Sequence, residues 1–342
     1  MKVLVTGGTG FVGSHAVREI LNTGHEVRML ARTPAKVPGV LTALGIAESD
    51  RPEVVAGDMT DPDTVEAALD GCDAVLHCAA EIGVAGGRGP SSTANIDGTR
   101  LIVDTAVKLG LDPIVYTSTI TVHLPAADPI ITHSTPLADP LSAYGAQKRL
   151  AEEYVQAAQA VGAPITTLVV GGVYGPHSPH LDGSHSALIA ALRSGMYAPD
   201  GGLGVLDVRD LATLIARTLI PGQGPRRYFA SGRYITWRHW AELLSRAAGR
   251  PVPYHVVPVD DMIQIGRELD AMRVQGRDVP PLSYEAAVIM SSGRPADDTA
   301  TLTDLDLTYR PTIDTFRDTI AWLGAQGRLP RHASGEPIPE PR

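Results

Sequence analysis

Short apolar runs alternate with helical patterns through the first half of the sequence. Six runs have the length and composition of β-strands, at residues 2–6, 26–30, 53–57, 73–79, 113–118 and 165–170. Four helical patterns lie between them, at residues 11–23, 62–70, 94–109 and 143–161. Several strands are apolar throughout, as expected when helices cover both faces of a sheet. The alternation therefore predicts an α/β fold with a doubly wound parallel sheet.

The pattern changes after Val170. Residues 171–185 form a loop rich in Gly, Pro and His, and further helices are expected near 184–195, 207–220, 236–248 and 258–273. We expect residues 1–170 to form the sheet domain, with segments around 205–231 returning to its sheet. Residues 171–329 should form mainly a smaller, mostly helical C-terminal lobe. Residues 330–342 are polar and rich in Pro, which predicts a flexible tail.

Charge and cysteine content argue against several classes of protein. The 38 acidic and 29 basic side chains give a net charge of −9 without a basic run, so no nucleic-acid partner is expected. No apolar run approaches the roughly 20 residues that span a membrane, and the N-terminus passes directly into glycines, so neither a membrane anchor nor a signal peptide is expected. Cys72 and Cys78 fit neither a zinc nor a redox spacing, which favours reduced thiols in a cytoplasmic protein.

The segment TGGTGFVGSH (6–15) joins the first strand to the first helix. Gly8, Gly10 and Gly13 fit G-x-G-x-x-G, while Gly7, Gly10 and Gly13 fit G-x-x-G-x-x-G. Either spacing allows a tight turn, close approach of backbone to a pyrophosphate, and packing of the helix on the strand. The helix N-terminus supplies N–H groups for the anion. The segment therefore predicts a dinucleotide site.

The end of the second strand indicates which dinucleotide is preferred. An NAD site usually carries Asp or Glu about 20 residues after the glycines, whereas arginine accommodates the 2′-phosphate of NADP. Arg32 stands at this place, with Arg28 and Lys36 nearby, so we expect NADP(H), with NAD(H) as the alternative. After the third strand, Asp58 is expected to accept a hydrogen bond from the adenine amine, and Met59 to pack on the ring.

Tyr144 and Lys148 are four residues apart at the start of the helix predicted at 143–161, so they share a face. A free phenol has a pKa near 10, and a nearby ammonium lowers it toward the range useful for acid/base chemistry. The hydroxyls of residues 117–119 are candidates to complete the set. Such a pair alone is weak, but beside a nucleotide loop it is a candidate catalytic pair. The remaining polar residues of this helix are expected on a solvated face: Arg149, Glu152 and Glu153.

These and other motifs resemble the extended short-chain dehydrogenases/reductases, which include epimerases, dehydratases and dihydroflavonol-reductase-like enzymes. The resemblance runs from Met1 to about Gly327. It rests on TGGTGFVG, GDMTD, VLHCAA, NIDGT, VYTSTITVH, YGAQK and VYGP. It implies a Rossmann domain for a nicotinamide cofactor, a lobe for a small-molecule carbonyl or alcohol substrate, and a homodimer.

The resemblance also implies roles for single residues. Tyr144 would be the acid/base, Lys148 would bind the nicotinamide ribose and lower the tyrosine pKa, and Thr119 would hydrogen-bond the substrate oxygen. Ser118 would be the helper or substitute of Thr119. The implied cofactor contacts are Gly7, Gly10, Phe11, Val12, Gly13, Arg32, Asp58, Met59, Ala79, Ala80, Thr117, Tyr144, Lys148, Val170 and Val173. The expected substrate wall comprises Glu81, Ile82, Leu124, Tyr174 and His177.

Three departures from the family pattern bear on the reaction. Sugar-nucleotide 4,6-dehydratases carry an Asp-Glu pair after the catalytic threonine, where this chain has Ile120 and Thr121. Epimerases usually carry an arginine that clamps a diphosphate, but residues 201–208 contain no basic side chain before Arg209. Val169 and Val170 replace an Arg-Pro pair that family members often have. The first two departures favour a reductase.

Other candidate residues are expected to be structural. His177, His180 and His185 lie in or near one loop, but their spacing matches no standard ligand set, so no metal is expected. They are interpreted as exposed, or as rimming the substrate cleft. His77, within the fourth strand, is expected to be a hydrogen-bonded structural residue.

We therefore expect an NADPH-dependent carbonyl reductase, or an alcohol dehydrogenase in reverse, acting on a moderately hydrophobic ketone or aldehyde. The alternatives are a sugar-nucleotide epimerase, an enzyme of the 3β-hydroxysteroid dehydrogenase/isomerase type, and a regulator that binds NADP without turnover. A complete Tyr, Lys and Thr set argues against the regulator.

Overall fold

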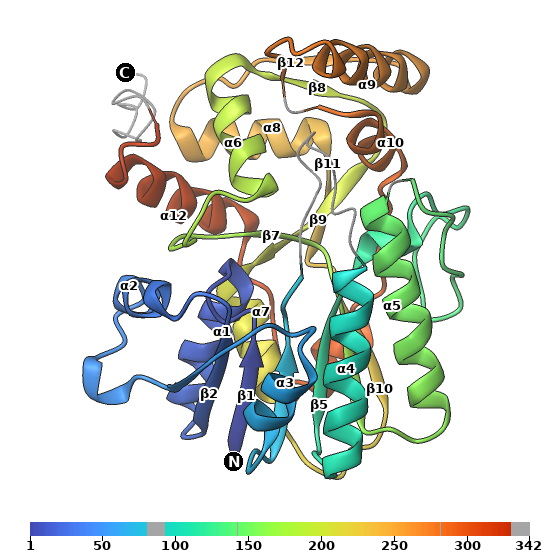
Figure 1. The fold of residues 1–342 in the computed structure, drawn as a ribbon. Helices are drawn as coiled ribbons and strands as arrows, with labels where there is room; N and C mark the ends of the chain where they lie inside the picture. Colours follow the sequence, from blue (N-terminus) through green and yellow to red (C-terminus); the bar gives the residue numbers. More distant parts are fainter. Residues whose placement is uncertain (81–92, 142, 281, 330–342) are drawn as a thin grey trace.

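Seven parallel strands form the central sheet of the protein, in the order β10-β6-β5-β4-β1-β2-β3 (Figure 1). The computed structural model describes residues 1–80, 93–141, 143–280 and 282–329. The strands are β1 (Lys2–Thr6), β2 (Glu26–Ala31), β3 (Glu53–Ala56), β4 (Ala74–His77), β5 (Ile114–Thr119), β6 (Ile165–Val170) and β10 (Arg226–Ala230). The predicted doubly wound α/β fold is confirmed.

The direction of winding reverses between β1 and β4. From β1 the chain builds outward through β2 and β3, and then returns to place β4 on the other side of β1. The last residues of these two strands, Thr6 and His77, are partners in the register. The loops after β1 and β4 therefore begin side by side at the carboxyl edge, which is where doubly wound sheets bind ligands.

Helices cover both faces of the sheet. On one face, α1 (Phe11–Asn22) packs on α7 (Val208–Arg217), and on the other α3 (Pro62–Leu69), α4 (Ala94–Leu109) and α5 (Ala143–Ala160) lie in a row (Figure 1). Side chains alternate along each strand, so Val3 and Val5 enter the core under α1, while Leu4 enters the core under α4. Between β2 and β3 the chain forms α2 (Val37–Ala43).

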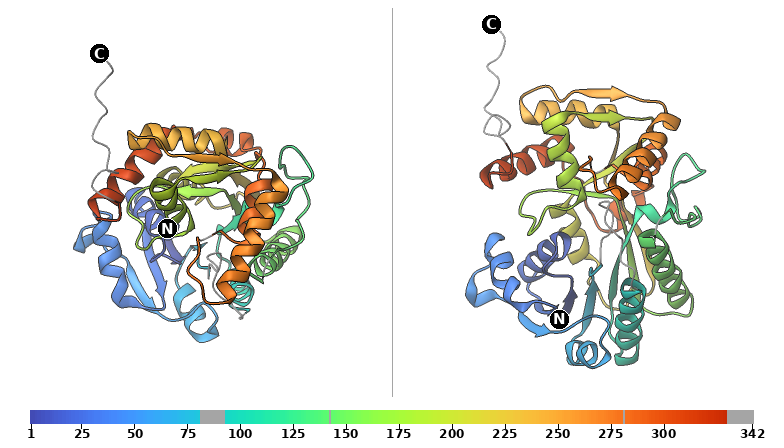
Figure 2. Two further views of the ribbon diagram at one scale, coloured as in Figure 1. Left: turned by 90° about the horizontal axis from the view of Figure 1, so that it is seen from above. Right: turned by 45° about the horizontal axis from the view of Figure 1, so that its top comes forward.

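The rest of the chain builds a lobe above the carboxyl edge (Figures 1 and 2). Its three-stranded sheet has the order β11-β9-β7, and a two-stranded sheet pairs β12 with β8. The strands are β7 (Gly172–Tyr174), β8 (Met196–Ala198), β9 (Gly202–Asp207), β11 (Arg233–Thr236) and β12 (Tyr254–Val256). The helices of the lobe are α6 (Gly183–Ser194), α8 (Trp237–Ala248), α9 (Val259–Val274), α10 (Tyr284–Ser292) and α12 (Thr312–Ala325), whereas α11 (Thr299–Asp304) packs against β10 of the central sheet. Trp240 and Phe316 meet edge to face in the core of the lobe.

One part of the expected sheet is different. We expected segments around 205–231 to complete the central sheet, and β10 does so beside β6. β9, however, pairs with β7 and β11 in the lobe. No helix in the described ranges is both long and apolar enough to cross a bilayer.

Candidate active site

The glycine loop folds over the ends of β1 and β4. Gly7 has a φ of +74°, and a Cβ there would lie 2.7 Å from the Ala79 amide nitrogen. A Cβ on Gly13 would lie 2.3 Å from the Gly7 carbonyl oxygen, so α1 could not approach the loop as closely with any larger residue. A Cβ on Gly8 would meet only flexible side chains, first the end of Met29. The positions at which a side chain would clash with backbone are therefore Gly7, Gly10 and Gly13, which follow the G-x-x-G-x-x-G spacing.

The first turn of α1 has the properties of an anion site. Gly10 is its N-cap and donates its N–H to the Gly7 carbonyl at 2.8 Å. Within the described residues, no side chain caps this helix, and its first turn contains no acid. The N-terminal amides and the helix dipole are thus left for a phosphate. Together with the close backbone packing, this fits the pyrophosphate of a dinucleotide, which Gly10, Phe11, Val12 and Gly13 would hold.

The adenine side of the expected site contains Arg32 and Asp58. Arg32 is exposed just beyond β2, and Asp58 follows β3. Partial burial opposes ionisation, but two hydrogen bonds from Thr60 and the charge of Arg32 lower the pKa of Asp58. Arg28 does not contribute here, because its guanidinium bonds to Glu53 and to backbone carbonyls near the end of α3.

The expected cofactor contacts around β4 and β6 lie at the same edge. Ala79 and Ala80 are half-buried after β4, and Val170 ends β6. Met59 is buried against Gly98 of α4, where a Cβ would lie 2.7 Å from the Met59 Cγ. The side chain of Met59 is thus already packed within the protein. Val173, in β7, packs against the core beneath α1.

Lys148 lies at the carboxyl end of β5. Its Nζ donates to the Thr117 carbonyl at 3.4 Å and lies 5.3 Å from the centre of the Tyr116 ring. Burial lowers the pKa of the Lys148 ammonium, whereas the carboxylate of Glu152 acts in the opposite direction. The side chain of Tyr144 lies outside the described part of the structure. Its backbone lies in the first turn of α5, one turn before Lys148.

Thr119 and Ser118 end β5 with different surroundings. Thr119 accepts a hydrogen bond from the Thr121 N–H at 3.3 Å and caps the short helix η3 (Ile120–His123). The hydroxyls of these two threonines are 3.1 Å apart. Ser118 is buried, and its Oγ has no hydrogen-bond partner among the described residues. Thr117, also expected to contact the cofactor, donates to the His77 carbonyl at 3.2 Å.

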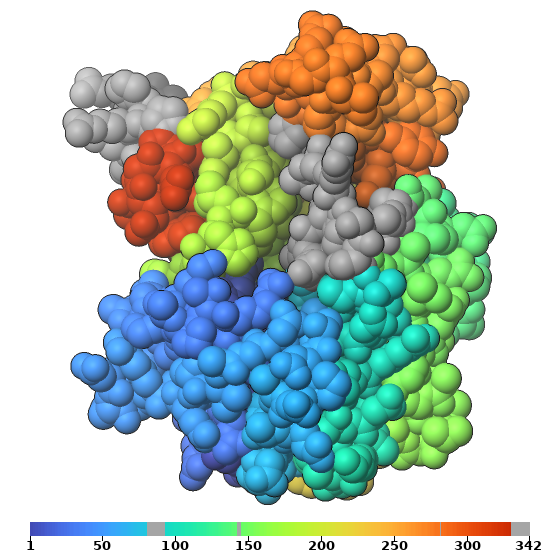
Figure 3. Space-filling view, viewed as in Figure 1, coloured from blue at the N-terminus to red at the C-terminus, as the bar shows by residue number. Residues whose placement is uncertain are grey.

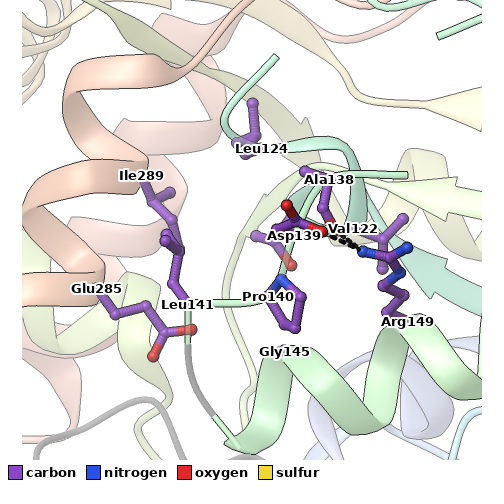
Figure 4. Close-up of a pocket in the computed structure, with 11 residues that line it drawn as sticks. Val122, Leu124, Ala138, Asp139, Pro140, Leu141, Gly145, Arg149, Glu285 and Ile289 are labelled. Atoms are coloured by element: carbon purple, nitrogen blue, oxygen red, sulfur yellow. Dashed lines mark hydrogen bonds and ion pairs between the residues drawn. The ribbon is translucent and has the colours of Figure 1, made fainter. Parts of the chain in front are cut away.

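A pocket lies beside η3 and the first turns of α5, with α10 as its opposite wall (Figure 4). Its apolar lining comprises Val122, Leu124, Pro140, Leu141 and Ile289. Arg149 of α5 pairs with Asp139 on one side at 2.8 Å, and Glu285 of α10 lies on the other side (Figure 4). Leu124, which we predicted on the substrate side, is therefore a pocket residue.

The other expected substrate residues lie elsewhere. Tyr174 is 2% exposed and packs edge to face on Phe316 in the lobe core. His177 is exposed in the loop after β7, with a φ of +61°. Glu81 and Ile82 lie outside the described residues.

The loop histidines do not all remain exposed as expected. His180 and His177 are exposed, but His185 is fully buried and stacks edge to face on Phe11, so α6 rests on the start of α1 (Figure 3). Its Nδ1 lies 2.7 Å from Asp182, and its Nε2 lies 2.9 Å from the Gly175 carbonyl. Both ring nitrogens thus face acceptors, an arrangement that favours the imidazolium form with its two N–H donors. Burial opposes this charge, but Asp182 raises the pKa of His185. The described residues contain no group of three or more metal-ligating side chains.

His77 is the hydrogen-bonded structural residue that we predicted. Its Nδ1 accepts a hydrogen bond from the Thr6 hydroxyl at 2.7 Å, and its Nε2 donates to the Thr99 hydroxyl. The Thr99 hydroxyl in turn donates a hydrogen bond to the Asn95 carbonyl. Burial lowers the pKa of His77 to about 3, which keeps the ring neutral. The side chain thus joins β1, β4 and α4 below the cofactor edge.

Comparison with known proteins agrees with this geometry. A model of the NAD dependent epimerase/dehydratase family matches residues 3–219, which is more than half of the chain. The chain belongs to this family. It is 26% identical to "Sterol demethylase protein B" of Methylococcus capsulatus over 337 residues, covering 96% of this chain and 100% of that protein. It is 29% identical to 2-alkyl-3-oxoalkanoate reductase of Stenotrophomonas maltophilia, covering 83% and 87% of the two chains.

The fold of this epimerase/dehydratase-family member is shared with solved structures. UDP-glucose 4-epimerase from Bifidobacterium longum, solved with NAD+ and UDP, superposes with a TM-score of 0.72 at 19% identity, covering 96% of this chain and 99% of that chain. The resemblance to extended short-chain dehydrogenases/reductases is confirmed. Family membership makes the protein an NAD(P)-dependent oxidoreductase or epimerase.

Sequence analysis missed one group beside the candidate catalytic pair. We expected Glu152 on a solvated face, but it is fully buried and forms an ion pair with Arg227 of β10. The signal was present in the helix itself, because Tyr144, Lys148 and Glu152 follow each other at intervals of four. The partner could not be inferred, since it lies 75 residues further along the chain.

Proposed function

We propose that this epimerase/dehydratase-family member is an NADPH-dependent carbonyl reductase, or an alcohol dehydrogenase in reverse, for a moderately hydrophobic ketone or aldehyde. The proposal rests on the position of Lys148, whose ammonium lies at the end of β5, the strand next to β4 and its cofactor-side loop. Apolar side chains line part of the small pocket beside Thr121, which is consistent with a hydrophobic substrate. The named activity of the oxoalkanoate reductase is consistent with this class of substrate.

When bound, NADPH supplies a hydride to the carbonyl carbon. The protein supplies the matching proton, which Tyr144 donates to the carbonyl oxygen, so that C=O becomes CH–OH. The Lys148 ammonium holds the nicotinamide ribose and favours the tyrosinate that remains. The Thr119 oxygen accepts the Thr121 N–H, which orients the Thr119 hydroxyl to donate its own proton to the substrate oxygen.

The chemistry of η3 also favours reduction over elimination of water. Ile120 is apolar, and Thr121 has a hydroxyl, 3.1 Å from that of Thr119, in place of a carboxylate, so neither supplies the acid or base that removes water. Arg32 at the exit of β2 supports NADPH over NADH, because its guanidinium can pair with a 2′-phosphate.

The test is NADPH oxidation with a panel of aliphatic and aryl ketones and aldehydes. Tyr144→Phe should lower kcat at least 100-fold for the best substrate while leaving NADPH affinity within about threefold. Tyr154→Phe is the matched control, since Tyr154 lies on the same helix but donates to Asp104 of α4, and it should retain activity. Copurified NAD with interconversion of UDP-sugars would instead show an epimerase. Tight NADPH binding without turnover would instead show a regulator.

A further inference from the structure

Lys148 is held in an environment that disfavours its charge. Its side chain is 7% exposed, and its surroundings are mainly uncharged. From β4 it faces the Cys78 thiol and the neutral His77 ring, and from β5 the Tyr116 ring and the Thr117 carbonyl. Burial raises the pKa of Cys78 to about 12, so this thiol carries no negative charge. The counter-charge for the ammonium must come from another group.

The charge of Glu152, in the next turn of α5, favours the Lys148 ammonium. Residues four apart on a helix share a face, and the Glu152 carboxylate is fully buried. Gln156 donates to its Oε1 at 3.2 Å, and Arg227 pairs with the same oxygen. In the described part of the chain, Oε2 has no hydrogen-bond partner. Leaving a buried carboxylate of this kind without a paired cation would be strongly destabilising.

Arg227, the cation paired with Glu152, is held in place by contacts with His123 and Phe229. Its Nη2 donates to the His123 Nε2 at 3.0 Å, and its guanidinium lies 5.8 Å from the centre of the Phe229 ring. His123 donates from Nδ1 to the Pro136 carbonyl at 3.1 Å, so it is the neutral tautomer that can accept from Arg227. Burial lowers the pKa of His123, in agreement with this tautomer.

We propose that Glu152 and Arg227 are positioning residues for the Lys148 ammonium: the charge of Glu152 favours the charged amine at the end of β5, and Arg227, anchored by His123, pairs with Glu152 and fixes its carboxylate one helical turn from Lys148. This role rests on the proposed reductase function only in that Lys148 must be charged to hold the nicotinamide ribose. The pair also links the catalytic helix to η3, which borders the apolar pocket.

The composition of the chain allows a direct measurement. It contains four lysines, Lys2, Lys36, Lys108 and Lys148, of which only Lys148 is buried. Protein labelled with ¹³Cε-lysine therefore gives four NMR signals, and Lys148→Met assigns the buried one. The midpoint of its pH titration can be followed without any turnover.

Glu152→Gln is the principal variant, and Glu153→Gln is its matched control. Glu152→Gln should lower the Lys148 midpoint by about one pH unit or more. Glu153 pairs with Arg149 at the surface, so its replacement should leave the midpoint unchanged. Because Glu152→Gln leaves Arg227 buried without a counter-charge, it risks unfolding; Glu152→Gln/Arg227→Gln removes both charges and should show the same fall.

NADPH affinity gives a second readout. In both Glu152 variants, the dissociation constant should rise about tenfold for each pH unit above the new midpoint, while the control follows wild type. An unchanged Lys148 midpoint in folded Glu152→Gln and in the double variant would overturn the inference. A lowered midpoint in a protein that reduces no ketone would support the positioning role and reject the proposed reaction.

Discussion

Arg28 and Arg32 are four residues apart, yet their surroundings give them different tasks. Arg28 is held by Glu53 and by the carbonyls of Ala68 and Asp70, so it fastens β2 to β3 and to the end of α3. Arg32 lies beyond the end of β2, exposed, near Asp58 at the carboxyl edge. Of these two arginines, Arg32 is therefore the one that we propose to meet the adenine ribose of a cofactor.

Arg32→Ala should change cofactor preference. A charge-assisted hydrogen bond contributes about 1.5–3 kcal/mol, so the NADPH dissociation constant should rise about 10- to 100-fold, while that for NADH changes less than about threefold. Fluorescence titration of both cofactors measures the two constants. Arg51→Ala is the control, because Arg51 pairs with Glu48 at a distance of 3.8 Å on the surface. Equal weakening of both cofactors by Arg32→Ala would contradict the assignment to NADPH.

At the level of elements, sequence patterns predicted the helices, strands and turns whose formation depends mainly on neighbouring residues. The central strands and the glycine loop followed from apolar runs and from backbone sterics, and α5 was expected at 143–161 and is found at Ala143–Ala160. β9 was misplaced because strand pairing depends on contacts far along the chain, here with β7 and β11. The burial of Glu152 was missed for the same reason, since its cation comes from β10.

The close packing of α1 on the glycine loop depends on the absence of a side chain at Gly13. Gly13→Ala places a Cβ against the Gly7 backbone, so α1 must move away from the loop. We expect a loss of about 1–3 kcal/mol in the free energy of unfolding and a rise of more than tenfold in the NADPH dissociation constant. Denaturant unfolding and fluorescence titration measure the two effects.

Gly8→Ala is the matched control for the loop. Its Cβ would first meet the terminal methyl of Met29, which can rotate away, so stability should fall by less than about 1 kcal/mol. If Gly8→Ala were as damaging as Gly13→Ala, the G-x-G-x-x-G spacing would describe this loop better than the spacing assigned here.

At the scale of the whole molecule, the central sheet passes into the lobe at two adjacent places. β6 continues into β7 through Gly171, which donates its N–H to the Ala230 carbonyl at the end of β10. β10 continues into β11 through Ser231 and Gly232. Asp298 holds this second passage by accepting from both backbone N–H groups, from the Ser231 hydroxyl, and from Tyr309 at 2.7 Å. One buried carboxylate therefore joins the sheet, the lobe and the segment before α12.

The charge of Asp298 should make this junction depend on pH. Burial outweighs its four hydrogen bonds and raises the pKa of Asp298 to about 6, whereas an unfolded aspartate titrates near 3.9. Its contribution to stability is thus fully present below about pH 4 and is lost as pH rises toward 6. Relative to wild type, Asp298→Asn should gain about 2–3 kcal/mol in unfolding free energy between pH 4 and 7, measured by denaturant titration at each pH. Asp297→Asn should show the opposite sign and only below about pH 5, because hydrogen bonds from Thr299 lower the pKa of that exposed neighbour, whose stabilising effect is lost as pH falls. If the free energy of unfolding varied with pH in the same way for wild type and Asp298→Asn, the charge of Asp298 would not affect the stability of this junction.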